Sequence, residues 1–232
     1  MTIIGENLAR VHKRIVAACH TAGRDPSEVS LLAVSKSMAA QAVAKALAAG
    51  QQAFGENYIQ EALVKIAALS QLNIEWHCIG PIQSNKTRLV AENFDWVQSI
   101  DRLKIAQRLS EQRPLHLAPL QVCIQVNIDG GASKAGVMPE EALVLARQIA
   151  ALPQLRLRGL MTIPEPAPDF DSACSVHLKT RTLFNALRRD GLPLDTLSMG
   201  MSDDLEAAIH CGSTLVRVGS AIFGPRPRAL HL

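Results

Sequence analysis

The feature that most constrains the fold is a regular alternation of short apolar segments with amphipathic helical segments along nearly the whole chain. Each apolar segment has the length of a strand and is followed by a helical pattern, which is the rhythm of βα units. Eight such segments occur in the 232 residues: 30–36, 52–57, 74–80, 95–100, 120–128, 155–163, 195–199 and 214–224. This pattern predicts a closed (β/α)8 TIM barrel, although an open doubly wound sheet has the same local rhythm.

One more helix is predicted before the first strand. Ile4, Leu8, Val11 and Ile15 recur at intervals that place them on one face of a helix ending near Gly23. No low-complexity segment or charged tail interrupts the pattern. We therefore expect a single α/β domain over residues 1–232 with an extra N-terminal helix.

Composition argues against several classes of function. The net charge is only +3, without a basic stripe, so we expect no nucleic-acid partner. No apolar run approaches the ~18 residues that span a bilayer and the start lacks a leader pattern, so we expect no membrane partner and a cytoplasmic location. The cysteines show neither CxxC pairing nor a zinc-type grouping with histidine, so we expect reduced thiols and no metal site.

The first strand carries the most unusual residue of the chain, Lys36. Period-two alternation places Lys36 on the same face as Leu32 and Val34, so it can point inward above two apolar layers at the carboxyl end of the strand. Active sites of barrel enzymes lie at that end. A partly desolvated amine there favours the neutral, nucleophilic form that attacks an aldehyde. The alternative is a lysine that bends outward into water.

The last strand places Arg217 on the inner face. An inward arginine needs an acceptor, which is either a carboxylate in a structural pair or a ring nitrogen or phosphate of a ligand. Gly219 and Ser220 follow, and their backbone amides can contribute to an anion site. Phosphate sites in barrels commonly lie after strands seven and eight, which favours the ligand.

The segment after the seventh strand allows two interpretations. Ser202 can join the phosphate site with Gly219 and Ser220. Ser202 can also simply cap the following helix, with Asp203 and Asp204 complementing its dipole and facing away from any bound phosphate, and both roles can coexist.

Further polar residues occur at the same predicted rim. Asn57 and His77 stand at strand ends and can line a pocket, although each alone is more often a satisfied core or loop residue. Lys86 and Lys134 can add positive charge, although a solvated lysine is more common.

Together, these motifs resemble the YggS/PROSC family of pyridoxal phosphate homeostasis proteins, over nearly the whole chain. The resemblance rests on AVSK (33–36), FGENYIQE (54–61), HCIGPIQSNK (77–86), SKAG (133–136), GLMTI (159–163), LSMGMSDDLEAAI (197–209) and VRVGSAIFG (216–224). The main departure is SKAG, where relatives often have SKSG. The family is similar to the barrel domain of alanine racemase and other fold type III enzymes. This implies that Lys36 holds pyridoxal 5'-phosphate (PLP) as an internal aldimine.

The resemblance also implies roles for the other candidate residues. They are Arg217 at the pyridine nitrogen, Ser202, Gly219 and Ser220 at the phosphate, and Asn57 and His77 beside the ring.

By the same resemblance, the protein holds, buffers or delivers PLP in vitamin B6 homeostasis, without an established catalytic activity. Its expected partners are PLP, other B6 vitamers and PLP-dependent apoenzymes, and we expect a monomer. An arginine at the ring nitrogen disfavours protonation of that nitrogen and so weakens the cofactor as an electron sink.

Two alternatives remain open. One is a PLP-dependent amino-acid racemase, which needs an acid/base group opposite the lysine; the only tyrosine is Tyr58. The other is a barrel enzyme in which Lys36 forms a Schiff base with a phosphorylated metabolite.

Overall fold

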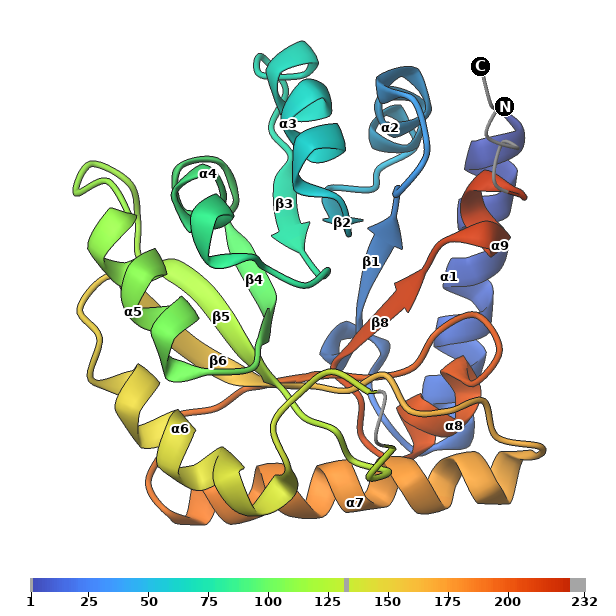
Figure 1. The fold of residues 1–232 in the computed structure, drawn as a ribbon. Coiled ribbons are helices and arrows are strands. Elements are labelled where there is room, and N and C mark those ends of the chain that lie inside the picture. Colours follow the sequence, from blue (N-terminus) through green and yellow to red (C-terminus); the bar gives the residue numbers. More distant parts are fainter. Residues whose placement is uncertain (1, 132–133, 226–232) are drawn as a thin grey trace.

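The computed structural model describes residues 2–131 and 134–225, and its parallel strands close into a barrel (Figure 1). The strands are β1 (Ser30–Val34), β2 (Ala53–Glu56), β3 (Glu75–Cys78), β4 (Trp96–Ile100), β5 (Leu120–Gln125), β6 (Leu155–Met161), β7 (Thr196–Ser198) and β8 (Leu215–Val218). Neighbours in sequence are neighbours in the sheet, and β8 pairs with β1. The predicted (β/α)8 barrel is confirmed, and the open sheet is excluded.

Helices surround the barrel and connect its strands. The α-helices are α1 (Ile3–Thr21), α2 (Ala40–Ala48), α3 (Ile59–Ala68), α4 (Thr87–Asn93), α5 (Leu103–Gln112), α6 (Ala142–Ala150), α7 (Phe170–Arg189), α8 (Leu205–His210) and α9 (Ser220–Phe223). Short 3-10 helices are η1 (Pro26–Glu28), η2 (Ser84–Lys86) and η3 (Pro139–Glu141).

The predicted N-terminal helix is present as α1. The side chain of Thr2 caps it by accepting from the Gly5 amide, and the helix buries Leu8, Val11 and Ile15. It packs against α8 and α9, which lie beside it in Figure 1. The extra helix therefore covers the outside of the barrel next to the last strand.

The final apolar segment was predicted as one strand over 214–224, and this is wrong in its second half. β8 ends at Val218, and α9 begins at Ser220. Gly219 lies between them with φ −116° and ψ −79°, outside the extended region, so the ladder stops there. The chain thus turns from a strand into a helix at this predicted site residue.

The strands are buried on both faces, as expected for a parallel barrel. In β1, Leu31 and Ala33 join the large core between strands and helices, whereas Leu32 packs inside the barrel with Ile79 and Leu215. The period-two assignment of β1 is therefore confirmed. A second apolar group inside the barrel consists of Trp96, Cys123 and Met161.

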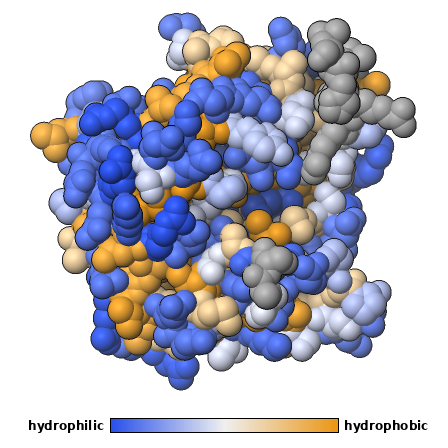
Figure 2. All heavy atoms as spheres, in the orientation of Figure 1, coloured by the Kyte–Doolittle hydropathy of each residue, from blue (hydrophilic) through white to orange (hydrophobic). Residues whose placement is uncertain are grey.

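The surface is largely polar on the face shown in Figure 2, where hydrophobic residues occur in small groups among hydrophilic ones. Across residues 2–131 and 134–225, no helix is both long enough and apolar enough to cross a bilayer. All five cysteines lie within these ranges and are free thiols. Burial raises the pKa of Cys78 and of Cys123 to about 12.

Candidate functional site

A cavity of about 300 Å³ lies at the carboxyl ends of the strands, and we call it the carboxyl-terminal pocket. It contains six of the seven residues that the sequence nominated: Lys36, Asn57, Ser202, Arg217, Gly219 and Ser220. They follow or end β1, β2, β7 and β8, four strands that are consecutive around the barrel only because β8 pairs with β1. Closure of the barrel therefore brings residues from both ends of the sequence into one pocket.

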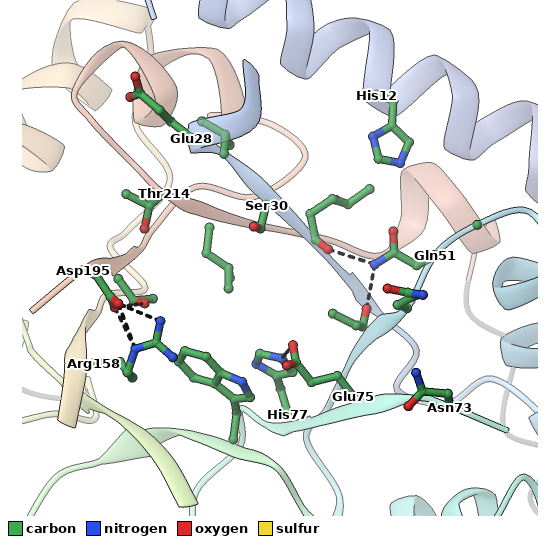
Figure 3. A pocket seen from close by; sticks show the side chains of 18 residues that line it. His12, Glu28, Ser30, Gln51, Asn73, Glu75, His77, Arg158, Asp195 and Thr214 are labelled. Carbon is green, nitrogen blue, oxygen red and sulfur yellow. Dashed lines mark hydrogen bonds and ion pairs between the residues drawn. The ribbon is translucent and has the colours of Figure 1, made fainter. Parts of the chain in front are cut away.

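The seventh residue, His77, does not line this pocket. It lines a larger cavity of about 700 Å³ at the amino-terminal mouth, next to Glu75 (Figure 3), and its ring stacks on Trp96. The reason is strand register, because β3 continues beyond His77. Ile79, one residue beyond the end of β3, lines the carboxyl-terminal pocket instead.

Lys36 lies half-buried in the pocket wall, just beyond the end of β1. The chain turns sharply there, because Ser37 adopts a φ of 64°. This left-handed conformation is unfavourable for a residue with a side chain, so other contacts must hold it. One such contact is a hydrogen bond of 2.6 Å, which the Ser37 amide donates to Glu61 Oε1.

A buried ion-pair cluster holds both sides of Lys36. Lys65 Nζ donates to the Ser35 carbonyl at 2.7 Å, to Glu56 Oε1 at 2.7 Å and to Glu61 Oε1 at 2.6 Å. The Ser35 hydroxyl also donates to Glu56 Oε1. Burial raises the pKa of Glu56, while the hydrogen bonds from Lys65 and Ser35 oppose this rise. The Lys65 ammonium group therefore holds Ser35 directly and Ser37 through Glu61, on the two sides of Lys36.

Arg217 is 3% exposed and lies in the floor of the pocket. Its Nη1 donates to Ser198 Oγ at 2.6 Å, and its Nη2 donates to the Thr162 carbonyl at 2.7 Å. Burial lowers its pKa to about 10, so it is cationic at neutral pH. No carboxylate of the described chain lies within ion-pair distance, so this arginine is not the structural pair considered above.

The candidate anion site is formed by the turns after β7 and β8. In α9 the helical hydrogen bonds begin at the amides of Ile222 and Phe223, both to the Gly219 carbonyl, so the preceding amides have no partner within the helix. A Cβ on Gly219 would lie 3.2 Å from the Val34 carbonyl oxygen. Glycine therefore allows this turn to approach the end of β1, next to Lys36.

Ser202 lines the pocket but does not cap α8. The N-cap is Asp204, whose Oδ1 accepts from the Met201 amide at 2.6 Å and whose Oδ2 contacts His177 Nε2 at 3.0 Å. The capping interpretation of Ser202 is therefore wrong. Asp203, by contrast, is exposed at the pocket wall, so one carboxylate borders the candidate anion site.

Asn57 presents a buried polar atom without a partner. Its Oδ1 is buried and accepts no hydrogen bond from the residues that the structure describes. The loop after β3 packs directly on its backbone, because a Cβ on Gly80 would lie 2.2 Å from the Asn57 carbonyl oxygen. A buried acceptor left open beside a pocket is a place where a ligand donor can bind.

The other rim residues lie outside the pocket lining. Lys86 ends η2 and is not among the lining residues, and Lys134 Nζ pairs with Glu165 Oε1 at 2.9 Å. In the SKAG loop, Ser133 lies outside the described residues. Tyr58 is 59% exposed and does not line the pocket.

The pocket thus combines an amine, a buried guanidinium, two hydroxyl groups and backbone amides that have no partner within α9, in a small volume. An amine can attack a carbonyl carbon, a guanidinium donates hydrogen bonds to an acceptor, and the hydroxyls and amides suit a phosphate. Sequence reasoning missed the cluster of Glu56, Glu61 and Lys65. Its only visible signal was the i,i+4 spacing of Glu61 and Lys65, which also describes ordinary exposed helix pairs.

Comparison with known proteins shows which proteins this chain is similar to. Residues 7–227 match the family model of the alanine racemase N-terminal domain. The pyridoxal phosphate homeostasis protein of Pseudomonas aeruginosa is 58% identical over 226 residues, 97% of each chain. That of Escherichia coli K12 is 52% identical over 229 residues, 97% of this chain and 98% of the other. The structure of Synechococcus elongatus PipY with PLP bound is 36% identical, with a TM-score of 0.84 over 95% of this chain and 100% of that chain.

Proposed function

Because the chain belongs to the family of pyridoxal phosphate homeostasis proteins, on the fold of the alanine racemase N-terminal domain, we propose that it holds PLP covalently on Lys36 and buffers or delivers it. The observation that carries this proposal is that Lys36 and Arg217 line one pocket of about 300 Å³. Arg217 is cationic and has no carboxylate of the described residues as an ion-pair partner. An aldehyde, a ring nitrogen and a phosphate are the groups that such a pocket suits.

The residues present fit PLP. Lys36 would provide the amine for its aldehyde carbon, and Arg217 would donate to its ring nitrogen. Ser202, Ser220 and the amides after Gly219 would hold the phosphate. The open acceptor Asn57 Oδ1 would lie beside the ring. When bound, PLP supplies an electrophilic carbon for amines and a conjugated ring that withdraws electrons.

His77 is left out of this assignment, although the resemblance implied a place for it beside the ring. It is buried at the amino-terminal cavity and hydrogen-bonds to Glu75 and Gln98.

A holding role is favoured over amino-acid racemisation. A two-base racemase needs a second acid/base group facing the cofactor from the side opposite the lysine. Tyr58 does not fit that role, because its side chain is largely exposed and does not line the pocket. We expect no racemisation of alanine above background in a chiral amino-acid assay with the PLP-loaded protein. Many turnovers of alanine per protein molecule, at a rate well above the rate with free PLP, would favour the racemase.

The direct test is borohydride reduction of the protein incubated with PLP, followed by peptide mass spectrometry. We expect one label, on Lys36, and an absorption band distinct from that of free PLP. Lys36→Ala should lose both, while its far-UV circular dichroism stays unchanged, because a half-buried rim residue contributes little to the core.

The matched control is Lys86→Ala, which removes a rim lysine outside the pocket lining. It should keep the label and the absorption band. Retention of the label by Lys36→Ala, or a label confined to another lysine, would reject the assignment. Absence of any label in the unmodified protein would instead favour a barrel acting on a phosphorylated metabolite.

Further features belong to the same proposal. We propose that the chain works as a single-domain monomer in the cytoplasm, where its five free thiols would remain reduced. The recipients would be PLP-dependent apoenzymes. Analytical ultracentrifugation and transfer of PLP to an apoenzyme in the presence of a PLP scavenger are the measurements that check these points.

A further inference from the structure

A chain of hydrogen-bonded side chains runs through the barrel interior and ends on Arg217. Arg217 Nη1 donates to Ser198 Oγ at 2.6 Å, and Ser198 Oγ donates to Gln98 Oε1 at 2.7 Å. Gln98 Nε2 lies 2.9 Å from His77 Nδ1, and His77 Nε2 lies 2.8 Å from Glu75 Oε1. The last link is visible in Figure 3. The chain therefore connects the carboxyl-terminal pocket with the amino-terminal cavity, across β8, β7, β4 and β3.

The two ends of the chain determine its direction. A guanidinium can only donate hydrogen bonds, and a carboxylate can only accept them. Ser198 Oγ must therefore accept from Arg217 and donate its hydroxyl hydrogen bond to Gln98 Oε1. A neutral His77 must donate from Nε2 to Glu75, which leaves Nδ1 to accept from the Gln98 amide. Every link then has one donor and one acceptor, and the carboxamide orientation and histidine tautomer follow.

The protonation states of His77 and Glu75 agree with this direction of donation. Burial lowers the pKa of His77, which favours the neutral ring, although Glu75 opposes this effect. The hydrogen bond from His77 lowers the pKa of Glu75, which favours the carboxylate. The His77 ring also stacks on Trp96, with centroids 5.1 Å apart and planes 8° from parallel. The histidine is therefore held in both orientation and tautomer.

The three middle residues of this hydrogen-bonded series are almost inaccessible to water. Gln98 and Ser198 are 0% exposed, and His77 is 1% exposed. Polar groups buried at this depth are costly unless all their hydrogen bonds are made, and a fully satisfied network holds one arrangement strongly. Such a network is unusual inside a barrel, where branched apolar side chains normally fill the layers.

We propose that Ser198, Gln98 and His77 are positioning residues for Arg217. Gln98 Oε1 accepts the hydrogen bond from the Ser198 hydroxyl, which leaves a lone pair of Ser198 Oγ to accept from Arg217 Nη1. With Nη2 also bound to the Thr162 carbonyl, both terminal nitrogens of Arg217 are anchored, and the guanidinium plane is held where Arg217 lines the pocket. This inference rests on the proposed function for its purpose, which is to hold Arg217 as a donor toward the ring nitrogen of PLP.

The first experiment needs no cofactor. Nitrogen-15 NMR of the cofactor-free protein reports the tautomer of His77 and the rotation of the Arg217 guanidinium about Nε–Cζ. We expect His77 to be protonated on Nε2 alone at pH 7, and the Arg217 rotation to be slow. Ser198→Ala and Gln98→Met should each accelerate that rotation. A proton on His77 Nδ1, or equal rotation in all three proteins, would overturn the proposal.

The second experiment measures PLP. Loss of a hydrogen bond to a charged group in a buried site predicts about tenfold weaker PLP binding in Ser198→Ala and Gln98→Met. The pH titration of the absorbance of bound PLP should also shift, because the donor to the ring nitrogen is no longer fixed. Ser198→Thr retains the hydroxyl and should restore affinity to within about threefold of the unmodified protein.

Ser110→Ala is the matched control, because Ser110 is also buried but lies in α5, outside the chain. It should leave both PLP affinity and the titration unchanged. Unmodified affinity and titration in Ser198→Ala and Gln98→Met would overturn the proposal. Failure of the unmodified protein to carry PLP on Lys36 would reject the proposed function instead, and the guanidinium rotation in cofactor-free protein would still decide whether the chain positions Arg217.

Discussion

Lys65 anchors the turn that carries Lys36, although it does not line the carboxyl-terminal pocket. Its side chain is 4% exposed, and it contacts the Ser35 carbonyl and two carboxylates. Removing one partner of a buried ion pair leaves the other charge uncompensated, which costs far more than the net contribution of the pair.

We therefore expect Lys65→Met to lower the free energy of unfolding by about 3–5 kcal/mol, measured by urea denaturation. Its yield of borohydride-trapped PLP on Lys36 should also fall, because the Ser35 carbonyl loses its anchor. Lys45→Met, on the exposed face of α2, is the control and should change stability by less than about 0.5 kcal/mol. Equal stabilities of the two variants would show that the cluster has no such role.

Asp203 is the one carboxylate in the wall of the carboxyl-terminal pocket, among the residues that the structure describes. It borders the candidate phosphate site, so it should repel a bound phosphate. Because Asp203 is exposed, solvent and salt weaken this repulsion.

We expect Asp203→Asn to tighten PLP binding by about two- to threefold at low ionic strength and to have little effect at 1 M salt. Fluorescence titration with PLP measures this change. Glu111→Gln, an exposed substitution on α5, should have no effect at either salt concentration. Weaker binding by Asp203→Asn would mean that this carboxylate supports the site instead.

At the scale of elements, Gly200 controls how α8 meets the end of β7. Its φ is +93°, and a Cβ there would lie 2.4 Å from the Cβ of Ala208 in α8. Gly50 has a similar φ of +99°, but a Cβ there would meet nothing within 4 Å. Replacing either glycine by alanine would therefore strain the backbone, but only at Gly200 would the added Cβ also overlap with another residue, Ala208.

We expect Gly50→Ala to cost about 1–2 kcal/mol of unfolding free energy from backbone strain alone. Gly200→Ala should cost about 1–3 kcal/mol more, because α8 must move, and it should weaken PLP binding through the displaced Ser202. Urea denaturation and PLP titration of both variants check this. Equal costs would show that α8 tolerates the added methyl group.

The sequence predicted the elements well because their signals are periodic and local. The inward faces of β1 and β8 follow from period two, and six of seven nominated residues line one pocket. His77 lies in the middle of its predicted segment 74–80, and it is Ile79, later in that segment, that reaches the pocket. Gln98 could not be assigned, because its partner Ser198 lies in β7, which only the closed barrel brings close to β4. Lys65 could not be assigned, because its contacts with the Ser35 carbonyl and Glu56 depend on how α3 packs beside β1 and β2.

At the scale of the whole molecule, the buried His77 predicts acid sensitivity. Its pKa in the fold is below the ordinary value of 6.5, because burial disfavours the charged ring. The unfolded chain therefore binds a proton first as the pH falls, so stability is lost from about pH 6.5 downward until the folded pKa is passed. Glu75, whose pKa is also lowered, adds a loss below its ordinary value of 4.5.

We expect the unfolding free energy of the unmodified protein to fall more steeply between pH 7 and 5 than that of His77→Gln, by up to about 1.4 kcal/mol per pH unit. Urea denaturation at a series of pH values measures the difference. Parallel curves for the two proteins would mean that folding does not lower the pKa of His77.

The pairing of β8 with β1 has a consequence for how the protein acquires its function. Lys36 and Arg217 stand on the two sides of this seam, so the pocket exists only after the last strand has docked on the first. Docking closes a loop of most of the chain, which is the slowest kind of contact to form. A chain still emerging from the ribosome therefore has its lysine long before it has its pocket, and PLP capture becomes a natural reporter of completed folding.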